Sequence, residues 1–194
     1  EIHPHDLSVE AIARFGASGI ILSGGPESVA GEKGPGVSDA VIDAGVPVLG
    51  ICYGMQALAA KLGGEVRGSD QREFGYAEVS LMGGDRLLGG LVGGEDRLKV
   101  WMSHGDRVEL LPEGFESIAA SRNAPLAGMA DVERRIYGLQ FHPEVTHTEK
   151  GQTIIERFVH KICGCPSDWT PSSIIAEHIE RVRDGVGVER VLLG

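Results

Sequence analysis

Short apolar runs that end in glycine-rich turns alternate with segments of helical spacing in the first third of the chain. Residues 19–23 and 46–51 are such runs and are typical of buried strands. Each follows a segment suited to a short helix, 8–15 and 38–44 respectively. This alternation indicates βα units, so the sequence predicts an α/β fold with a mostly parallel central sheet flanked by helices.

The pattern changes after residue 52. Met55, Leu58, Ala59 and Leu62 recur at helical intervals, and Gly63 ends that helix. Short strands are predicted at 75–82, 98–103 and 115–121, a hairpin at 126–141, and a helix with one apolar stripe at 148–163.

The character of the sequence changes again near Cys165, where we place a domain boundary. Residues 1–165 form the predicted main domain, and residues 166–194 begin as a linker. A short C-terminal linker helix starts at Pro171, which suits the first helical position, and runs to about Arg183. Residues 185–187 break that helix, and residues 190–194 are predicted to begin a strand.

Composition argues against several classes of partner. The chain of 194 residues has 28 acidic and 18 basic residues and a net charge of -10, which disfavours nucleic acid and anionic membranes. No apolar run reaches the roughly 18 to 20 residues of a membrane span, and the first residues do not resemble a secretory signal. Three cysteines do not form a secreted disulfide framework, so we expect a cytoplasmic protein.

A candidate nucleophile lies where the second apolar run meets a helix. Gly50-Ile51-Cys52-Tyr53-Gly54 has the form of a nucleophile elbow, in which small flanking residues permit a strained turn. The positive end of the following helix would favour a thiolate at Cys52. The alternative is that Cys52 is a small buried hydrophobic residue at the end of a strand.

A candidate base for this cysteine follows the predicted hairpin, in Phe141-His142-Pro143-Glu144. Pro143 favours extended backbone at His142, so the side chains of His142 and Glu144 should project to the same side. Glu144 could then orient the imidazole and select its tautomer. A solvated turn is the alternative, but together with the elbow the segment suggests a Cys-His-Glu triad.

Acyl transfer also needs donors for a developing oxyanion. The backbone N–H of Tyr53, directly after the nucleophile, is one candidate. A second is the N–H of Gly25 in the turn Gly24-Gly25-Pro26, because Pro26 has no N–H. On its own, that tripeptide would be interpreted as a simple turn.

Three segments together resemble the signatures of the class I, or triad-type, glutamine amidotransferases, in the same order and at matching separations. They are residues 23–28 (SGGPES), 50–56 (GICYGMQ) and 141–148 (FHPEVTHT). Within that family, residues 72–76, 100–106 and 169–171 resemble the GMP synthetases, and the likeness spans nearly the whole chain.

The resemblance implies a glutaminase domain that passes ammonia to a synthetase domain, where xanthosine monophosphate activated by ATP is aminated to GMP. Cys52, His142 and Glu144 match the family's triad, and Gly25 and Tyr53 match its oxyanion donors. Residues that match the contacts to the glutamine α-amino and carboxylate groups are Gln56 and the main chain at Ser103 and His104.

The resemblance also implies which partners and cofactors to expect and which segments of the family the sequence lacks. We expect a synthetase partner, on the same or another chain, and a homodimer of the full enzyme. No cofactor is expected in this domain, whereas ATP and Mg²⁺ are expected in the synthetase domain. The family's first strand and helix have no counterpart here, and residues 166–194 resemble the linker and the start of an ATP-pyrophosphatase domain. We therefore expect a piece of a longer polypeptide.

Three other interpretations stay open at this point. Cys163 and Cys165 have C-x-C spacing but no further ligands nearby, so we predict no metal site and interpret both as structural. A γ-glutamyl hydrolase, a peptidase or another triad-type amidotransferase could use the same residues. A non-catalytic docking module would use Cys52 only for packing.

Overall fold

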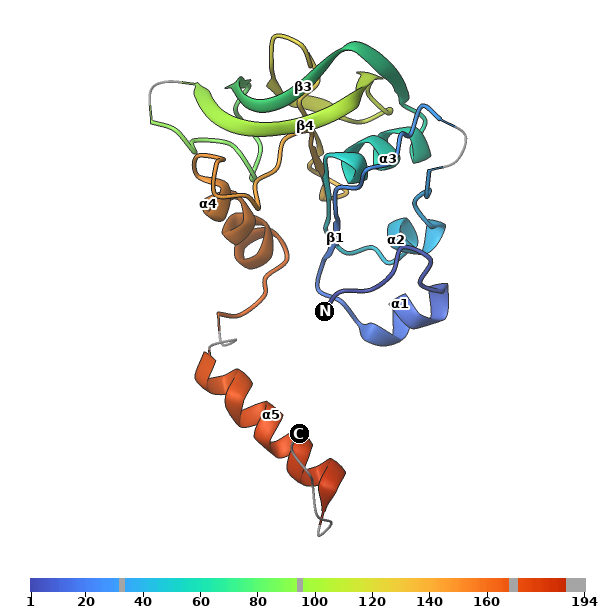
Figure 1. The fold of residues 1–194 in the computed structure, drawn as a ribbon, viewed down its shortest axis with the longest axis vertical. Helices are drawn as coiled ribbons and strands as arrows, with labels where there is room; N and C mark the ends of the chain where they lie inside the picture. The colour runs from blue at the N-terminus through green and yellow to red at the C-terminus, as the bar shows by residue number, and fades with distance from the viewer. Residues whose placement is uncertain (32–33, 94–95, 168–170, 188–194) are drawn as a thin grey trace. The chain divides into compact units, whose positions relative to one another are not determined.

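The structure, a computed structural model, describes residues 1–31, 34–93, 96–167 and 171–187. It divides into two units, Glu1–Gly164 and Cys165–Gly194, close to the boundary predicted at Cys165. The first unit contains one sheet (Figure 1). Its strands among the described residues are β1 (Ile20–Leu22), β2 (Val48–Ile51), β3 (Glu65–Leu81), β4 (Arg97–Leu110), β5 (Glu116–Ala120), β6 (Gly128–Asp131) and β7 (Ile136–Leu139).

The sheet is mixed and has the strand order β1-β2-β7-β6-β5-β3-β4. Only β1, β2 and β7 pair in parallel, and the remaining pairs are antiparallel. The predicted α/β class is confirmed, but the parallel part is smaller than predicted. The reason is that parallel neighbours need long crossover connections, whereas β6 and β7 are joined by a short hairpin.

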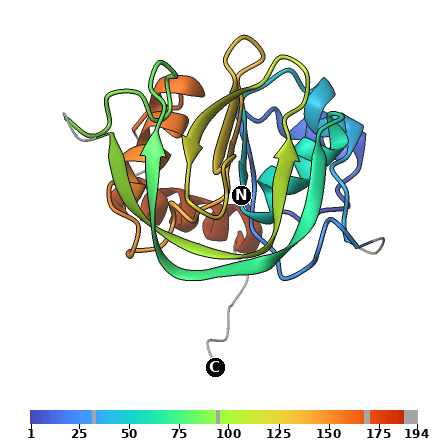
Figure 2. The same ribbon diagram turned by 90° about the horizontal axis from the view of Figure 1, so that it is seen from above.

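The antiparallel strands β3 and β4 are each longer than the strands that the sequence predicts. The two strands follow one long curve side by side in both views (Figures 1 and 2). The predicted segments, 75–82 and 98–103, are only parts of them. Residues 65–73 are rich in charged side chains and carry no apolar alternation, and a register shift interrupts the pairing between Gly68 and Glu73.

Helices cover both faces of the sheet. In the first unit they are α1 (Val9–Phe15), α2 (Asp39–Asp43), α3 (Tyr53–Lys61), α4 (Gly151–Glu156) and the π-helical segment η1 (Arg157–Ile162). Adjacent residues of a strand face opposite sides, so Ile136 packs with α3 while Tyr137 packs with α4 and η1. The first three helices confirm the prediction, with Ser8 and Ser38 as N-caps of α1 and α2.

The helix predicted over 148–163 differs at its start and in its later turns. It begins at Gly151, after Lys150 in a left-handed conformation, and becomes π-helical from Arg157. The apolar stripe is nevertheless the one predicted, because Ile154, Phe158 and Ile162 are all buried in the main core cluster.

The second unit contains α5 (Pro171–Val186). It starts at the predicted proline but continues through Gly185, beyond the predicted end near Arg183. The strand predicted at 190–194 lies outside the described residues. No helix in the described ranges is both long enough and apolar enough to span a bilayer.

Candidate active site

Cys52 lies at the turn between β2 and α3, where the sequence predicts the elbow. Its backbone has φ 51° and ψ −107°, a conformation that residues with a side chain rarely adopt. A Cβ on Gly50 would lie 2.6 Å from the backbone of Gly54, and one on Gly54 would collide with the carbonyl oxygen of Leu22. The strained turn is therefore confirmed, and packing requires a glycine on each side of it.

His142 and Glu144 follow β7 and face each other. The Nδ1 of His142 lies 2.7 Å from the Oε1 of Glu144, so the two side chains project to the same side, as predicted. The backbone of His142 is also fixed at both ends: its N–H donates to the carbonyl of Trp101, and its carbonyl accepts from the Thr148 hydroxyl at 2.6 Å. These contacts hold the imidazole on a rigid segment.

The electrostatic surroundings of His142 favour its protonated form. The thiol of Cys52 first, and then the carboxylate of Glu144, raise the pKa of His142 to about 10, although burial acts in the opposite direction. Burial raises the pKa of Glu144, but hydrogen bonds from His142 and from the backbone outweigh it and leave that pKa below its usual value. The pair therefore favours an imidazolium held by a carboxylate.

Cys52 and His142 meet beneath the turn that contains Gly24. A Cβ on Gly24 would lie 3.1 Å from Cε1 of His142 and 3.7 Å from Cβ of Cys52. The Nε2 of His142 is buried and makes no hydrogen bond to a described residue, so its contact with the thiol is looser than the Nδ1 contact with Glu144. That nitrogen is the atom available for proton exchange.

The two residues predicted to supply oxyanion donors are also brought together. A Cβ on Gly25 would lie 3.7 Å from Cγ of Tyr53. The loop that carries Gly25 is anchored to β4, because the Oδ2 of Asp106 accepts from the Ser28 hydroxyl at 2.6 Å and from the Ala30 N–H at 3.1 Å. Donation by Gly25 and Tyr53 to an oxyanion stays a prediction.

The residues predicted to bind substrate differ in their exposure and orientation. The carbonyl of Ser103 accepts from the Cys52 thiol at 3.4 Å, so its main chain borders the nucleophile. Gln56 is buried, and its amide nitrogen donates to the Asp106 carbonyl at 2.7 Å and to Gln140 at 3.1 Å. Only the side-chain oxygen of Gln56 is left to accept from a substrate ammonium group.

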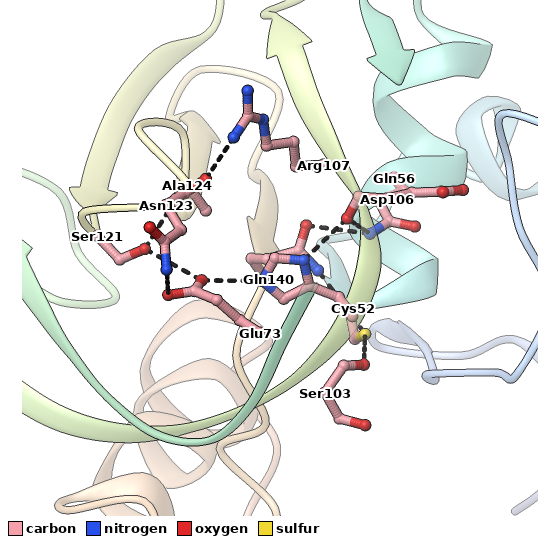
Figure 3. Close-up of polar contacts among 11 residues, drawn as sticks. Cys52, Gln56, Glu73, Ser103, Asp106, Arg107, Ser121, Asn123, Ala124 and Gln140 are labelled. Carbon is pink, nitrogen blue, oxygen red and sulfur yellow. Dashed lines mark hydrogen bonds and ion pairs between the residues drawn. The ribbon is translucent and has the colours of Figure 1, made fainter. Parts of the chain in front are cut away.

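The buried His104 side chain belongs to a partly buried polar cluster that includes Glu73 of β3. Its Nδ1 lies 3.0 Å from the Asp106 carbonyl, and its Nε2 lies 3.1 Å from the Glu73 carboxylate. Glu73 also accepts from Ser121 and Asn123 (Figure 3). The side chain of His104 therefore holds the backbone of β4, and the contribution of its main chain to a substrate pocket stays a prediction.

Sequence reasoning missed three residues of this site: Glu73, Asp106 and Gln140. Gln140 is completely buried, and its amide nitrogen lies 3.7 Å from the Cys52 sulfur. It is the one polar side chain between Gly138 and Phe141 in an otherwise apolar strand end, and that was the signal that could have revealed it. Glu73 and Asp106 lie in the segments 72–76 and 100–106 that carry the resemblance to GMP synthetases, but no pattern around either residue indicated a role in this site.

Cys163 packs against the main core cluster, and a Cβ on Gly19 would collide with its sulfur. Its environment is that of a structural residue. Nowhere in the part of the chain that the structure describes do three His, Cys, Asp or Glu side chains gather as a metal site would require.

Comparison with known proteins identifies the family. The family model for "Glutamine amidotransferase class-I" matches residues 1–162. The GMP synthases of Nitrosococcus oceani and Alkalilimnicola ehrlichii are each 57% identical to the chain over its whole length. The chain spans 38% of the length of each of these two relatives.

A solved structure gives the same result. A Thermoplasma acidophilum protein, whose crystal structure is named as that of a GMP synthase subunit, superimposes with a TM-score of 0.71. It is 30% identical, and the match covers 93% of this chain and 84% of that one. The chain therefore belongs to the class I glutamine amidotransferases.

Proposed function

We propose that this chain hydrolyses glutamine to glutamate and ammonia and that Cys52, His142 and Glu144 form its catalytic triad. The observation that carries the proposal is the strained Cys52 elbow, with the imidazole of His142 next to it and Glu144 hydrogen-bonded to the far side of that imidazole at 2.7 Å. This is the order of contacts that an activated thiol nucleophile requires.

In the proposed mechanism the Cys52 thiolate attacks the side-chain carboxamide carbon of glutamine. The C–N bond then breaks, and Nε2 of His142 gives its proton to the departing ammonia, leaving a glutamyl thioester. His142 next takes a proton from water, the resulting hydroxide cleaves the thioester, and glutamate leaves. Throughout the reaction the Glu144 carboxylate accepts a hydrogen bond from Nδ1–H of His142. Nε2 of His142 is therefore the nitrogen that exchanges protons.

Two backbone donors complete the mechanism. The N–H groups of Tyr53 and Gly25 stabilise the oxyanion that develops on the carboxamide oxygen. The hydrogen bonds that Asp106 accepts from Ser28 and Ala30 support the role of Gly25 as a donor, because they fix the loop that carries it. Gln56 and the main chain at Ser103 and His104 hold the α-amino and carboxylate groups of glutamine.

We further propose that the ammonia serves a GMP synthase. The 57% identity to two GMP synthases over the whole chain supports this assignment. The ammonia then passes to a synthetase part, which uses ATP and Mg²⁺ to aminate xanthosine monophosphate. That part is the main protein partner, and the full enzyme acts as a cytoplasmic homodimer.

The proposal is tested by incubating the protein with free glutamine and, in parallel, with a γ-glutamyl peptide, and measuring ammonia and glutamate. We expect turnover of free glutamine, and loss of that turnover when a thiol-directed glutamine analogue labels Cys52. Preference for the peptide would assign a γ-glutamyl hydrolase. Absence of both turnover and labelling would assign a docking module and overturn the proposal.

A further inference from the structure

The sulfur of Cys52 has two polar contacts besides the nearby His142. The thiol donates to the carbonyl of Ser103 at 3.4 Å, and the amide nitrogen of Gln140 lies 3.7 Å from the sulfur, within reach of an N–H···S hydrogen bond. Gln140 directly follows the last residue of β7, and its side chain is completely excluded from solvent. The geometry around the sulfur therefore includes one acceptor and one donor.

The orientation of the Gln140 amide follows from its neighbours. The carbonyl oxygen of Asp106 can only accept, so the group of Gln56 that contacts it at 2.7 Å must be the NH₂. The same NH₂ faces the side-chain oxygen of Gln140 at 3.1 Å. The remaining end of the Gln140 amide, its NH₂, must then face Cys52 (Figure 3).

A second layer of contacts holds the Asp106 carbonyl in place. The Nδ1 of His104 lies 3.0 Å from the same oxygen, and the other ring nitrogen is held by Glu73. His104 is buried, as are Gln56 and Gln140. The contact between Gln56 and Gln140 is thus excluded from water, which would otherwise compete for that hydrogen bond, and the contacts from Glu73 to the Asp106 carbonyl are partly buried.

We propose that Gln140 is a further catalytic residue, whose carboxamide donates a hydrogen bond to the Cys52 thiolate. The proposal rests on the proposed function only in taking Cys52 as the nucleophile. When the thiol loses its proton, the contact with the Ser103 carbonyl loses its hydrogen and sets an oxygen lone pair against a negative sulfur. The Gln140 contact persists and gains strength, because its acceptor is now charged.

The test is the pH dependence of Cys52 alkylation by iodoacetamide, measured without glutamine in the intact protein and assigned to Cys52 by peptide mapping. The Gln140→Met variant keeps the side-chain volume but removes the donor. We expect the midpoint of the alkylation profile to move upward by about one pH unit or more, the scale of a hydrogen bond to a charged group. The titratable group facing the thiol is His142, which the variant leaves unchanged.

Tyr137→Phe is the matched control. Tyr137 lies on β7, three residues before Gln140, is equally buried, and has a hydroxyl without a hydrogen-bond partner among the described residues. Its alkylation profile should match that of the wild type. A folded Gln140→Met variant with the wild-type profile would overturn the proposal.

Gln56→Met tests the same contact if Gln140→Met does not fold. It leaves Gln140 in place but removes the group that orients its amide, so a smaller upward shift of the midpoint is expected. An unchanged midpoint in this variant would also overturn the proposal. Because the readout is alkylation, neither result depends on glutamine turnover, which tests the proposed function separately.

Discussion

The positive φ of Cys52 links the local backbone to the chemistry of the side chain. Holding Cys52, which has a Cβ, at φ 51° lowers the stability of the fold by about 1 to 3 kcal/mol. The surrounding packing maintains this conformation, since the N–H of Cys52 donates to the Leu139 carbonyl at 2.7 Å and the first turn of α3 follows immediately. The strain is thus located at the residue whose sulfur meets the imidazole.

The first prediction concerns Cys52 itself. Cys52→Ala should reduce glutamine turnover on the order of 10³-fold or more, because no other group can form the thioester. Ammonia release from glutamine by the purified variant is the measurement, with circular dichroism as a check on folding. Substantial residual turnover by a folded variant would show that Cys52 is not the nucleophile.

Glu144 gives a graded test of the triad. Glu144→Gln keeps a hydrogen-bond acceptor but removes the negative charge, which lowers the pKa of His142 from its raised value. The turnover number at saturating glutamine should fall measurably, but less than for His142→Ala. If Glu144→Gln matches the wild type while Cys52→Ala and His142→Ala are inactive, the site is a Cys-His dyad.

At the scale of elements, the site depends on how closely α3 approaches β1 and β2. The two elbow glycines permit this approach, because a Cβ on either would meet backbone atoms. Backbone cannot move aside as a flexible side chain can, so the cost of added volume is high at these positions. The position of Cys52 therefore depends on the packing of a whole helix against two strands.

Gly50→Ala should destabilise the fold by about 1 to 3 kcal/mol and lower glutamine turnover, since its Cβ would lie 2.6 Å from the Gly54 backbone. Gly36→Ala is the matched control, because a Cβ there would meet nothing within 4 Å. Urea unfolding midpoints of the two variants give the comparison. Equal midpoints would mean that the β2–α3 contact is not under this steric constraint.

Elements with apolar periodicity were the predictable ones. The positions of β1, β2 and α3 were predicted correctly, the two strands from the apolar runs at 19–23 and 46–51 and the helix from its apolar stripe. The polar half of β3 was missed because its strand state comes from pairing with β4 and not from its own pattern. The π-helical turns of η1 were also missed, since an apolar stripe does not distinguish them from an α-helix.

At the scale of the whole molecule, sequence reasoning identified residues with a characteristic motif and missed those defined by contacts. Cys52, His142 and Glu144 stand in short recognisable segments, and the structure brings them together. Gln140 and Asp106 contribute through hydrogen bonds to residues far away in the sequence, such as Cys52 and Ser28. Such contacts exist only once the sheet has formed, so one sequence alone does not reveal them.

The last prediction concerns the division of labour between this chain and the synthetase part that its relatives suggest. The GMP synthases of Nitrosococcus oceani and Alkalilimnicola ehrlichii are much longer than this chain, which spans 38% of the length of each. If ammonia is made here and used elsewhere, Cys52→Ala in the intact enzyme should abolish GMP formation from glutamine but spare GMP formation from added ammonium salt.

The two activities should be measured in one preparation, with xanthosine monophosphate and ATP at saturation and either glutamine or ammonium as nitrogen donor. Gln140→Met provides a graded comparison, because it should lower only the glutamine-dependent rate and leave the ammonia-dependent rate unchanged. Loss of both rates in Cys52→Ala would instead mean that Cys52 supports the fold, because the proposal gives the thiol no part in the ammonia-dependent reaction. Retention of both rates would place glutamine hydrolysis at another nucleophile.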